Sequence, residues 1–195
     1  SNETATIDIS GVSGGSATED GTQNVTITII DNESAPTVTL SRGAAAIDED
    51  SGSTVTITAT LSVATFQDVT VTIDGTGGTG TEGTDFGTVS NITISAGSTT
   101  GTAAVDPTDD NVYEGDETAG ISISGVSGGG ASESGSQSVT VTITEDESAP
   151  TVTLTVSATS IAENAGTSLT ITATLSSTSD EDVTVSLSTS GTATE

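Results

Sequence analysis

The acidic residues of this chain gather in short clusters that could hold a metal ion. The densest cluster spans residues 109–117, and smaller ones stand at 48–50, 82–85 and 145–147. Carboxylate oxygens in a chain without His or Cys suit Ca2+, which takes about six to eight oxygen ligands at flexible geometry. Mg2+ demands a stricter octahedron, and Zn2+ and Cu2+ prefer nitrogen or sulfur ligands. Crowded like charges also repel one another, and a cation would relieve that repulsion. The clusters therefore predict bound calcium.

The overall charge excludes several classes of function. Asp and Glu number 28 against a single Lys or Arg, which gives a formal net charge of -27. Such a chain cannot neutralise phosphates, so we expect no nucleic-acid partner.

No apolar run approaches the roughly 18 residues of a membrane helix, so we expect no membrane insertion. Because His and Cys are absent and only one Tyr and two Phe are present, we also expect no enzyme activity.

The sequence is repetitive. Residues 7–40 recur without a gap as residues 121–154, an offset of 114 positions. Each boundary reads Ser-Ala-Pro, and proline suits a linker or the first residue of a strand. We therefore divide the chain into the C-terminal part of one repeat (1–34), a complete repeat (35–148) and the N-terminal part of the next repeat (149–195).

Within the complete repeat, apolar residues alternate with threonine. Val55, Ile57, Ala59 and Leu61 alternate with Thr residues, as in a half-buried strand. The pattern predicts strands at 54–61, 69–73 and 139–144, with further strands near 37–40, 91–95, 101–106 and 119–124. Several short strands separated by turn residues predict an all-β sandwich. Its core contains hardly an aromatic residue, so each repeat should be only marginally stable without an ion.

Three segments resemble a known family. Residues 80–86 (GTEGTDF), 94–105 (ISAGSTTGTAAV) and 109–117 (DDNVYEGDE) are similar to the core signature of Calx-beta domains, which occur in sodium–calcium exchangers and as tandem repeats in bacterial cell-surface adhesins. The resemblance implies tandem Ig-like antiparallel β-sandwiches. It also implies that calcium binds at one end of each sandwich, close to the junction with the next domain.

The resemblance also implies a set of ligands. In the complete repeat these are Glu49, Asp85, Asp109, Asp110, Glu114, Glu117, Glu145, Asp146 and Glu147. Asp31 and Glu33 would belong to the site of the preceding repeat, and Glu163 corresponds to Glu49 in the following one. Only the complete repeat holds a full set.

These observations predict a calcium-binding spacer repeat of a large secreted or cell-surface adhesin, stiffened by calcium at its interdomain ends. Its partners would be calcium ions, neighbouring repeats of the same chain and other copies of the protein. The alternative is a self-assembling extracellular fibre or sheath built from the same repeats. A calcium-sensing regulatory domain inside a transporter is disfavoured, because such a domain would not recur at a fixed offset.

Overall fold

The computed structural model describes residues 2–164 and 166–192, which fall into two compact units, Ser1–Ala35 and Pro36–Glu195. The first unit is a hairpin of β1 (Glu3–Asp8) and β2 (Asn24–Ile29), paired antiparallel. Both of its strands are exposed along their whole length. Residues 193–195, the end of the predicted following repeat, lie outside the described residues.

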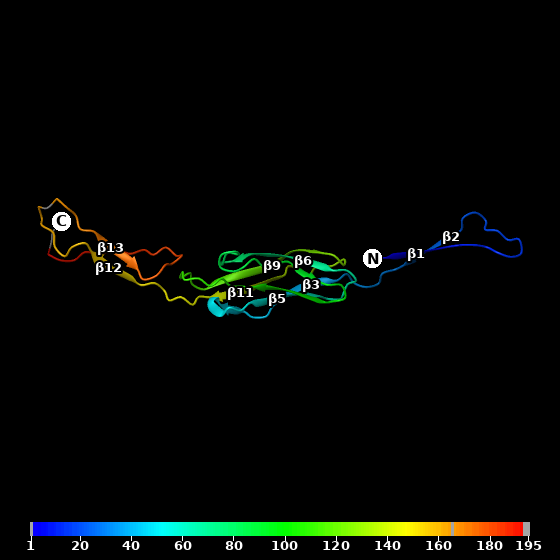
Figure 1. Cartoon of the computed structure of the whole chain (residues 1–195), viewed down its shortest axis with the longest axis horizontal. Coiled ribbons are helices and arrows are strands. Elements are labelled where there is room, and N and C mark those ends of the chain that lie inside the picture. The colour runs from blue at the N-terminus through cyan, green and yellow to red at the C-terminus, as the bar shows by residue number, and fades with distance from the viewer. Residues whose placement is uncertain (1, 165, 193–195) are drawn as a thin grey trace. The chain divides into compact units, whose positions relative to one another are not determined.

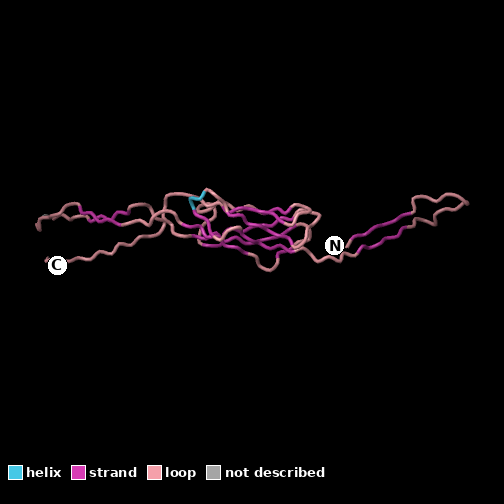
Figure 2. The backbone as a smooth tube through the Cα atoms, turned by 90° about the horizontal axis from the view of Figure 1, so that it is seen from below, coloured by secondary structure: helices cyan, strands magenta, loops and turns pink. Residues whose placement is uncertain are grey.

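The second unit contains a β-sandwich of two facing sheets (Figures 1 and 2). One sheet has the strand order β10-β3-β5-β8 and the other has the order β4-β11-β9-β6-β7. Their bounds are β3 (Thr37–Arg42), β4 (Ala46–Asp48), β5 (Val55–Leu61), β6 (Val69–Gly78), β7 (Ile92–Ile94), β8 (Thr100–Val105), β9 (Glu117–Ser127), β10 (Ser132–Glu133) and β11 (Ser138–Thr144).

The sandwich confirms the predicted all-β fold, and each predicted strand is present. Two short edge strands were not predicted, β4 and β10, because two or three residues are too few to show alternation. Both pair in parallel, β4 with β11 and β10 with β3, whereas the other strand pairs of the sandwich are antiparallel. The β4 pairing matters for the site, because it aligns two chain segments that both leave the sheet at the same end.

The core lies between the two sheets and is built from small aliphatic side chains. The alternating residues of β5 are buried, and so are Val69 and Val71 of β6 and Ile121 of β9. Phe86 is the one large aromatic residue in this cluster of buried side chains, whereas Phe66 is fully exposed. The core is thus built mainly from Val, Ile, Leu and Ala, the residues that alternate with Thr in the sequence.

Strands β6 and β9 approach one another closely near the end of β6. Their pairing shifts register between Asp74 and Gly77, which marks a bulge. A β-carbon added to Gly120 would stand 2.5 Å from the carbonyl carbon of Gly77, so no larger side chain fits there. The loop that supplies Asp85 begins just after this contact, where β6 ends.

The part of the following repeat within this unit forms a hairpin of β12 (Val152–Val156) and β13 (Ile171–Leu175). Both strands are exposed. A single turn of 3-10 helix, η1 (Glu49–Ser51), follows β4 in the sandwich. No helix among the described residues has the length and apolar character needed to cross a membrane.

Candidate metal centre

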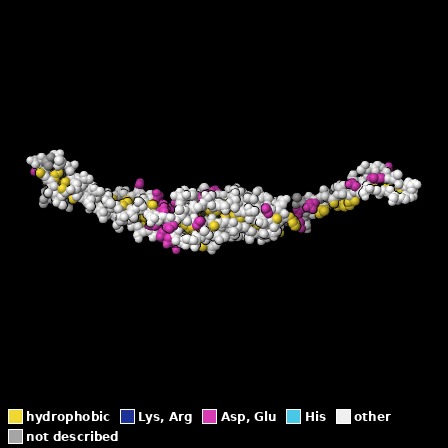
Figure 3. Space-filling view, in the orientation of Figure 1, with side chains coloured by type: hydrophobic (Ala, Val, Ile, Leu, Met, Phe, Trp, Pro, Cys, Tyr) yellow, Lys and Arg dark blue, Asp and Glu magenta, His cyan; other side chains and the backbone are white. Residues whose placement is uncertain are grey.

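Strand pairing brings four acidic segments to one end of the sandwich. Parallel pairing sets Asp48 of β4 beside Thr144 of β11, so the residues that follow both strands emerge together. Antiparallel pairing of β11 with β9 sets Ile143 beside Glu117, which places the 109–116 loop at the same end. The loop that follows β6 also arrives there, because Gly78 pairs with Ala119. Asp and Glu side chains accordingly gather at this end of the sandwich (Figure 3).

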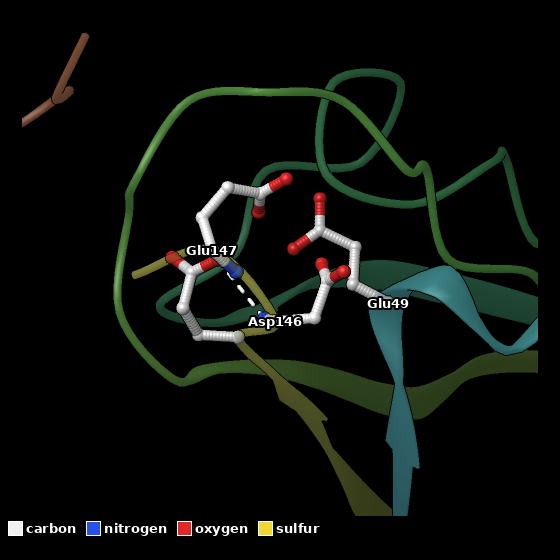
Figure 4. Close-up of side chains that lie close together, drawn as sticks. Glu49, Asp146 and Glu147 are labelled. Carbon is white, nitrogen blue, oxygen red and sulfur yellow. Dashed lines mark hydrogen bonds between the residues drawn. The ribbon is translucent and has the colours of Figure 1, made fainter. Parts of the chain in front are cut away.

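The first group of carboxylates consists of Glu49, Glu145, Asp146 and Glu147, each of which offers an oxygen within 4.8 Å of the others. The carboxylates of Glu49, Asp146 and Glu147 point toward a common space (Figure 4). Glu49 is only 7% exposed, and its carboxylate accepts no hydrogen bond from any described residue. The Oε2 atom of Glu147 is likewise buried without a hydrogen-bond partner among these residues.

The second group consists of Asp85, Glu114 and Glu117, again with oxygens within 4.8 Å of one another. Asp85 is held in place because its Oδ2 atom accepts a hydrogen bond of 2.6 Å from the Thr81 N–H. Glu49 is among the charges that act on Glu117, so the two groups influence one another electrostatically. Together they form an acidic centre shared by four chain segments.

Glu145 organises the loops around this centre. Its Oε2 atom accepts hydrogen bonds from the N–H groups of Glu114 (2.6 Å) and Gly115 (2.7 Å). Its Oε1 atom accepts from Asp146 (3.1 Å) and Glu147 (3.0 Å). Burial opposes ionisation of Glu145, but the backbone donors prevail and lower its pKa to about 2. Glu145 is therefore an ionised clamp that fixes the 109–116 loop against the end of β11.

The pKa values of the other four glutamates of the centre, Glu49, Glu114, Glu117 and Glu147, are raised. Burial, followed by the charge of Glu145, raises the pKa of Glu49 to about 7. Burial, followed by the charge of Asp85, raises the pKa of Glu117 to about 7 and also raises that of Glu114. A hydrogen bond to Glu145, together with burial, raises the pKa of Glu147 to about 7. The chain has a single Lys or Arg and no His, and no positively charged side chain is among the groups that act on these four pKa values.

The geometry fits a calcium ion. Oxygens bound to one Ca2+ at about 2.3–2.6 Å lie at most about 5 Å apart across the ion. The oxygens of each group meet that limit, since they lie within 4.8 Å of one another. Buried charges in proteins are normally paired or coordinate a metal, and the Glu49 carboxylate has no protein partner among the described residues. The carboxylates of both groups are thus suitable ligands for one or two calcium ions.

Not every residue predicted from sequence enters these two groups. Asp109 and Asp110 are exposed and belong to neither group, although the charge of Asp110 acts on both Glu49 and Glu114. The Oδ1 atom of Asp110 accepts the Val112 N–H at 2.7 Å, which closes a local turn.

The predicted residues of the neighbouring repeats lie elsewhere. Asp31 and Glu33 belong to the first unit, where the Asp31 Oδ1 atom accepts the Glu33 N–H at 3.2 Å. Glu163 is exposed in a turn between β12 and β13. Neither of these two segments contributes to a group of three or more carboxylates among the described residues.

Sequence reasoning missed two acidic residues near the centre. The Oδ1 atom of Asp116 accepts the Glu145 N–H at 3.1 Å and so completes the clamp. Asp180 lies in the following repeat, and its charge acts on Glu114. Its acidic neighbours Glu181 and Asp182 were a visible signal, but the approach of Asp180 to the 109–116 loop depends on tertiary structure.

Two family models match this chain. Residues 35–147, more than half of the chain, match the family model of the LapA domain, and residues 145–195 match that of the Calx-beta domain. The predicted resemblance to Calx-beta domains is therefore confirmed. No match was found among curated proteins.

Two solved structures are similar to this chain. The first, described as CBD12 from CALX1.2, has 22% sequence identity and a TM-score of 0.49; the similarity covers 57% of this chain and 44% of that one. The second, the apo-form Calx CBD1 domain, has 21% identity and a TM-score of 0.46 over 57% of this chain and 99% of that one.

Proposed function

This chain belongs to the LapA domain family, and from that premise we propose that it is a calcium-binding structural repeat of a cell-surface or secreted adhesin. The observation that carries the proposal is Glu49: the residue is only 7% exposed, and its carboxylate lies among other carboxylates with no hydrogen-bond partner among the described residues. The Calx-beta match of residues 145–195 supports calcium as the ion, because calcium binding is what the resemblance to that family implied.

The ion would stabilise the folded structure and would take no part in a reaction. Glu49, Asp146 and Glu147 would hold calcium in the first group, and Asp85, Glu114 and Glu117 in the second. A bound ion would supply positive charge where loops from β4, β6, β9 and β11 meet and would remove their mutual repulsion. Free calcium at a hundred times the dissociation constant adds about 2.7 kcal/mol of stability per site. For a sandwich with so small a core, this is a large share of the total stability.

A spacer function follows from the repeated architecture. Repeats that contact only their neighbours build extended, quasi-one-dimensional proteins. An ion at the end of each sandwich would hold the loops nearest to the next repeat. The same proposal assigns no catalytic role to the centre and places the protein outside the cell, where calcium is abundant.

Calcium binding is tested directly by isothermal titration calorimetry of the 195-residue chain. We expect calcium to bind and to raise the thermal unfolding midpoint, and magnesium to bind more weakly. Glu147→Gln and Glu117→Gln, one from each group, should each weaken binding about tenfold or more. The matched control is Asp50→Asn, which removes the same charge from an exposed side chain beside Glu49. Equal melting midpoints in calcium and in chelator would refute the proposal.

A further inference from the structure

The β1–β2 hairpin of the first unit exposes an apolar face. Opposed residues of an antiparallel pair lie on the same face of the sheet, and on this face Ala5 stands opposite Ile27 and Ile7 opposite Val25. The side chains of Ile7, Val25 and Ile27 are all exposed, and hydrophobic atoms lie on the surface of this hairpin (Figure 3). Contiguous apolar surface of this kind marks a site of interaction.

The same hairpin occurs inside the sandwich, where its apolar face is buried. At the offset of 114, β1 and β2 correspond to the first part of β9 and to β11. The register is also the same, since Ala5 opposite Ile27 corresponds to Ala119 opposite Val141. Ile27 is 49% exposed, whereas Val141 is fully buried. The face that β1–β2 exposes is therefore the face that β9 and β11 pack into the core.

The β12–β13 hairpin stands in the same relation to the opposite sheet. At the offset of 114 it corresponds to β3 and β5, again in the same register. Ile171 of β13 is 57% exposed, whereas its counterpart in β5, Ile57, is fully buried. This hairpin thus exposes the face that β3 and β5 pack into the core.

The two exposed faces fit one another, because their counterparts form one core. In the sandwich, β3 and β5 belong to one sheet, and β9 and β11 belong to the other. Ile57 of the first sheet and Val141 of the second are members of the same buried cluster. The apolar face of a β12–β13 hairpin is therefore the surface that would cover a β1–β2 hairpin, and the reverse is equally true.

The segments that carry the hairpins also supply most other strands of a sandwich. Val183 and Val185 are exposed, and they correspond to the buried Val69 and Val71 of β6. Residues 82–114 have no counterpart in residues 2–34 or 149–192. That range holds β7 and β8, which are the last strands at one edge of their sheets. A sandwich assembled from the two segments would lack these edge strands and keep the central ones.

We propose that the β12–β13 hairpin of one copy of this chain packs face to face against the β1–β2 hairpin of a second copy, so that the two copies complete a β-sandwich between them. The two surfaces differ, so the interface is heterologous, and a copy that is engaged through one hairpin keeps the other for a further copy. The net charge of -27 on each copy opposes this association, so the association strengthens as salt screens the charge. It requires no bound calcium and is independent of the function proposed above.

The test is sedimentation equilibrium of the full 195-residue chain in chelator, with about 0.5 M NaCl to screen the charge. Ile27→Glu places a carboxylate on the apolar face of β1–β2, and Ile171→Glu places one on that of β12–β13. The matched controls are Thr28→Glu and Thr172→Glu, which add the same charge at exposed neighbours on the opposite faces. All four positions are exposed and lie outside the sandwich, so its melting midpoint should not change and serves as the check on folding.

We expect the average mass of the parent and of both Thr variants to rise with protein concentration. Each Ile variant alone should associate at least about tenfold more weakly, because the added carboxylate would be buried without a partner. An equimolar mixture of Ile27→Glu and Ile171→Glu should form dimers of one chain of each kind and nothing larger, since each variant retains the hairpin that the other has lost. A parent that stays monomeric at every concentration would overturn the inference. Ile variants that associate as the parent does, or a mixture that stays monomeric, would overturn it as well.

Discussion

Replacing Glu49 by glutamine should stabilise the calcium-free protein and weaken its response to calcium. Glutamine has nearly the same shape as glutamate and no charge, and its amide N–H groups can donate to the surrounding carboxylates. The parent side chain is buried and its pKa is raised from 4.5 to about 7, first by burial and then by the neighbouring Glu145. At about pH 8 the parent must therefore hold an ionised carboxylate in an unfavourable environment.

The size of the effect follows from that pKa. Each pKa unit between the unfolded and folded values corresponds to about 1.4 kcal/mol, which makes the cost of ionised Glu49 about 3.5 kcal/mol at most. Relaxation of the loops lowers the expected gain in Glu49→Gln to about 2 kcal/mol. For a sandwich of this size, that gain corresponds to a rise of about 6–10 °C in the melting midpoint.

The assay is thermal unfolding followed by circular dichroism at about pH 8, in chelator and in millimolar calcium. Glu49→Gln should melt higher than the parent in chelator and gain less from calcium. Asp50→Asn, which changes an exposed neighbour, should match the parent within about 0.5 kcal/mol under both conditions. An unchanged or lower midpoint for Glu49→Gln in chelator would refute the reasoning, because the buried charge would then cost nothing.

Three further predictions concern pH and the core. Since Glu49 and Glu117 have raised pKa values in the folded state, that state binds more protons than the unfolded chain between about pH 4.5 and 7. The calcium-free melting midpoint should therefore fall as the pH rises through this window, and a rise would contradict the pKa values. Phe86→Ala removes the large aromatic side chain from the core and should cost about 3–5 kcal/mol by urea unfolding, whereas Phe66→Ala, at an exposed site, should change stability by less than about 0.5 kcal/mol. Gly120→Ala would force a β-carbon against the facing backbone of β6, and should lower the urea midpoint by an amount equivalent to about 2 kcal/mol or more.

The sequence by itself determined the longer strands of the sandwich and the kind of ligand atoms that the chain can offer a metal. Successive side chains of a strand point to opposite faces of the sheet. The alternation of apolar residues with Thr therefore identified the core-facing residues of β5 without a structure. Acidic residues at strand ends pointed to calcium because His and Cys are absent. These properties are local, and they depend on residue type and spacing alone.

Tertiary structure decided which carboxylates meet. Glu49 reaches Glu145–Glu147 through the parallel pairing of β4 with β11, and β4 is too short to be recognised in the sequence. Asp109 and Asp110 were expected to be ligands, yet both stand outside the two groups, and a turn engages Asp110. The approach of Asp180 depends on pairing between residues far apart in the chain. The physical reason is that the register of distant strands is set by packing of the core, and no local pattern encodes which loops that packing brings together.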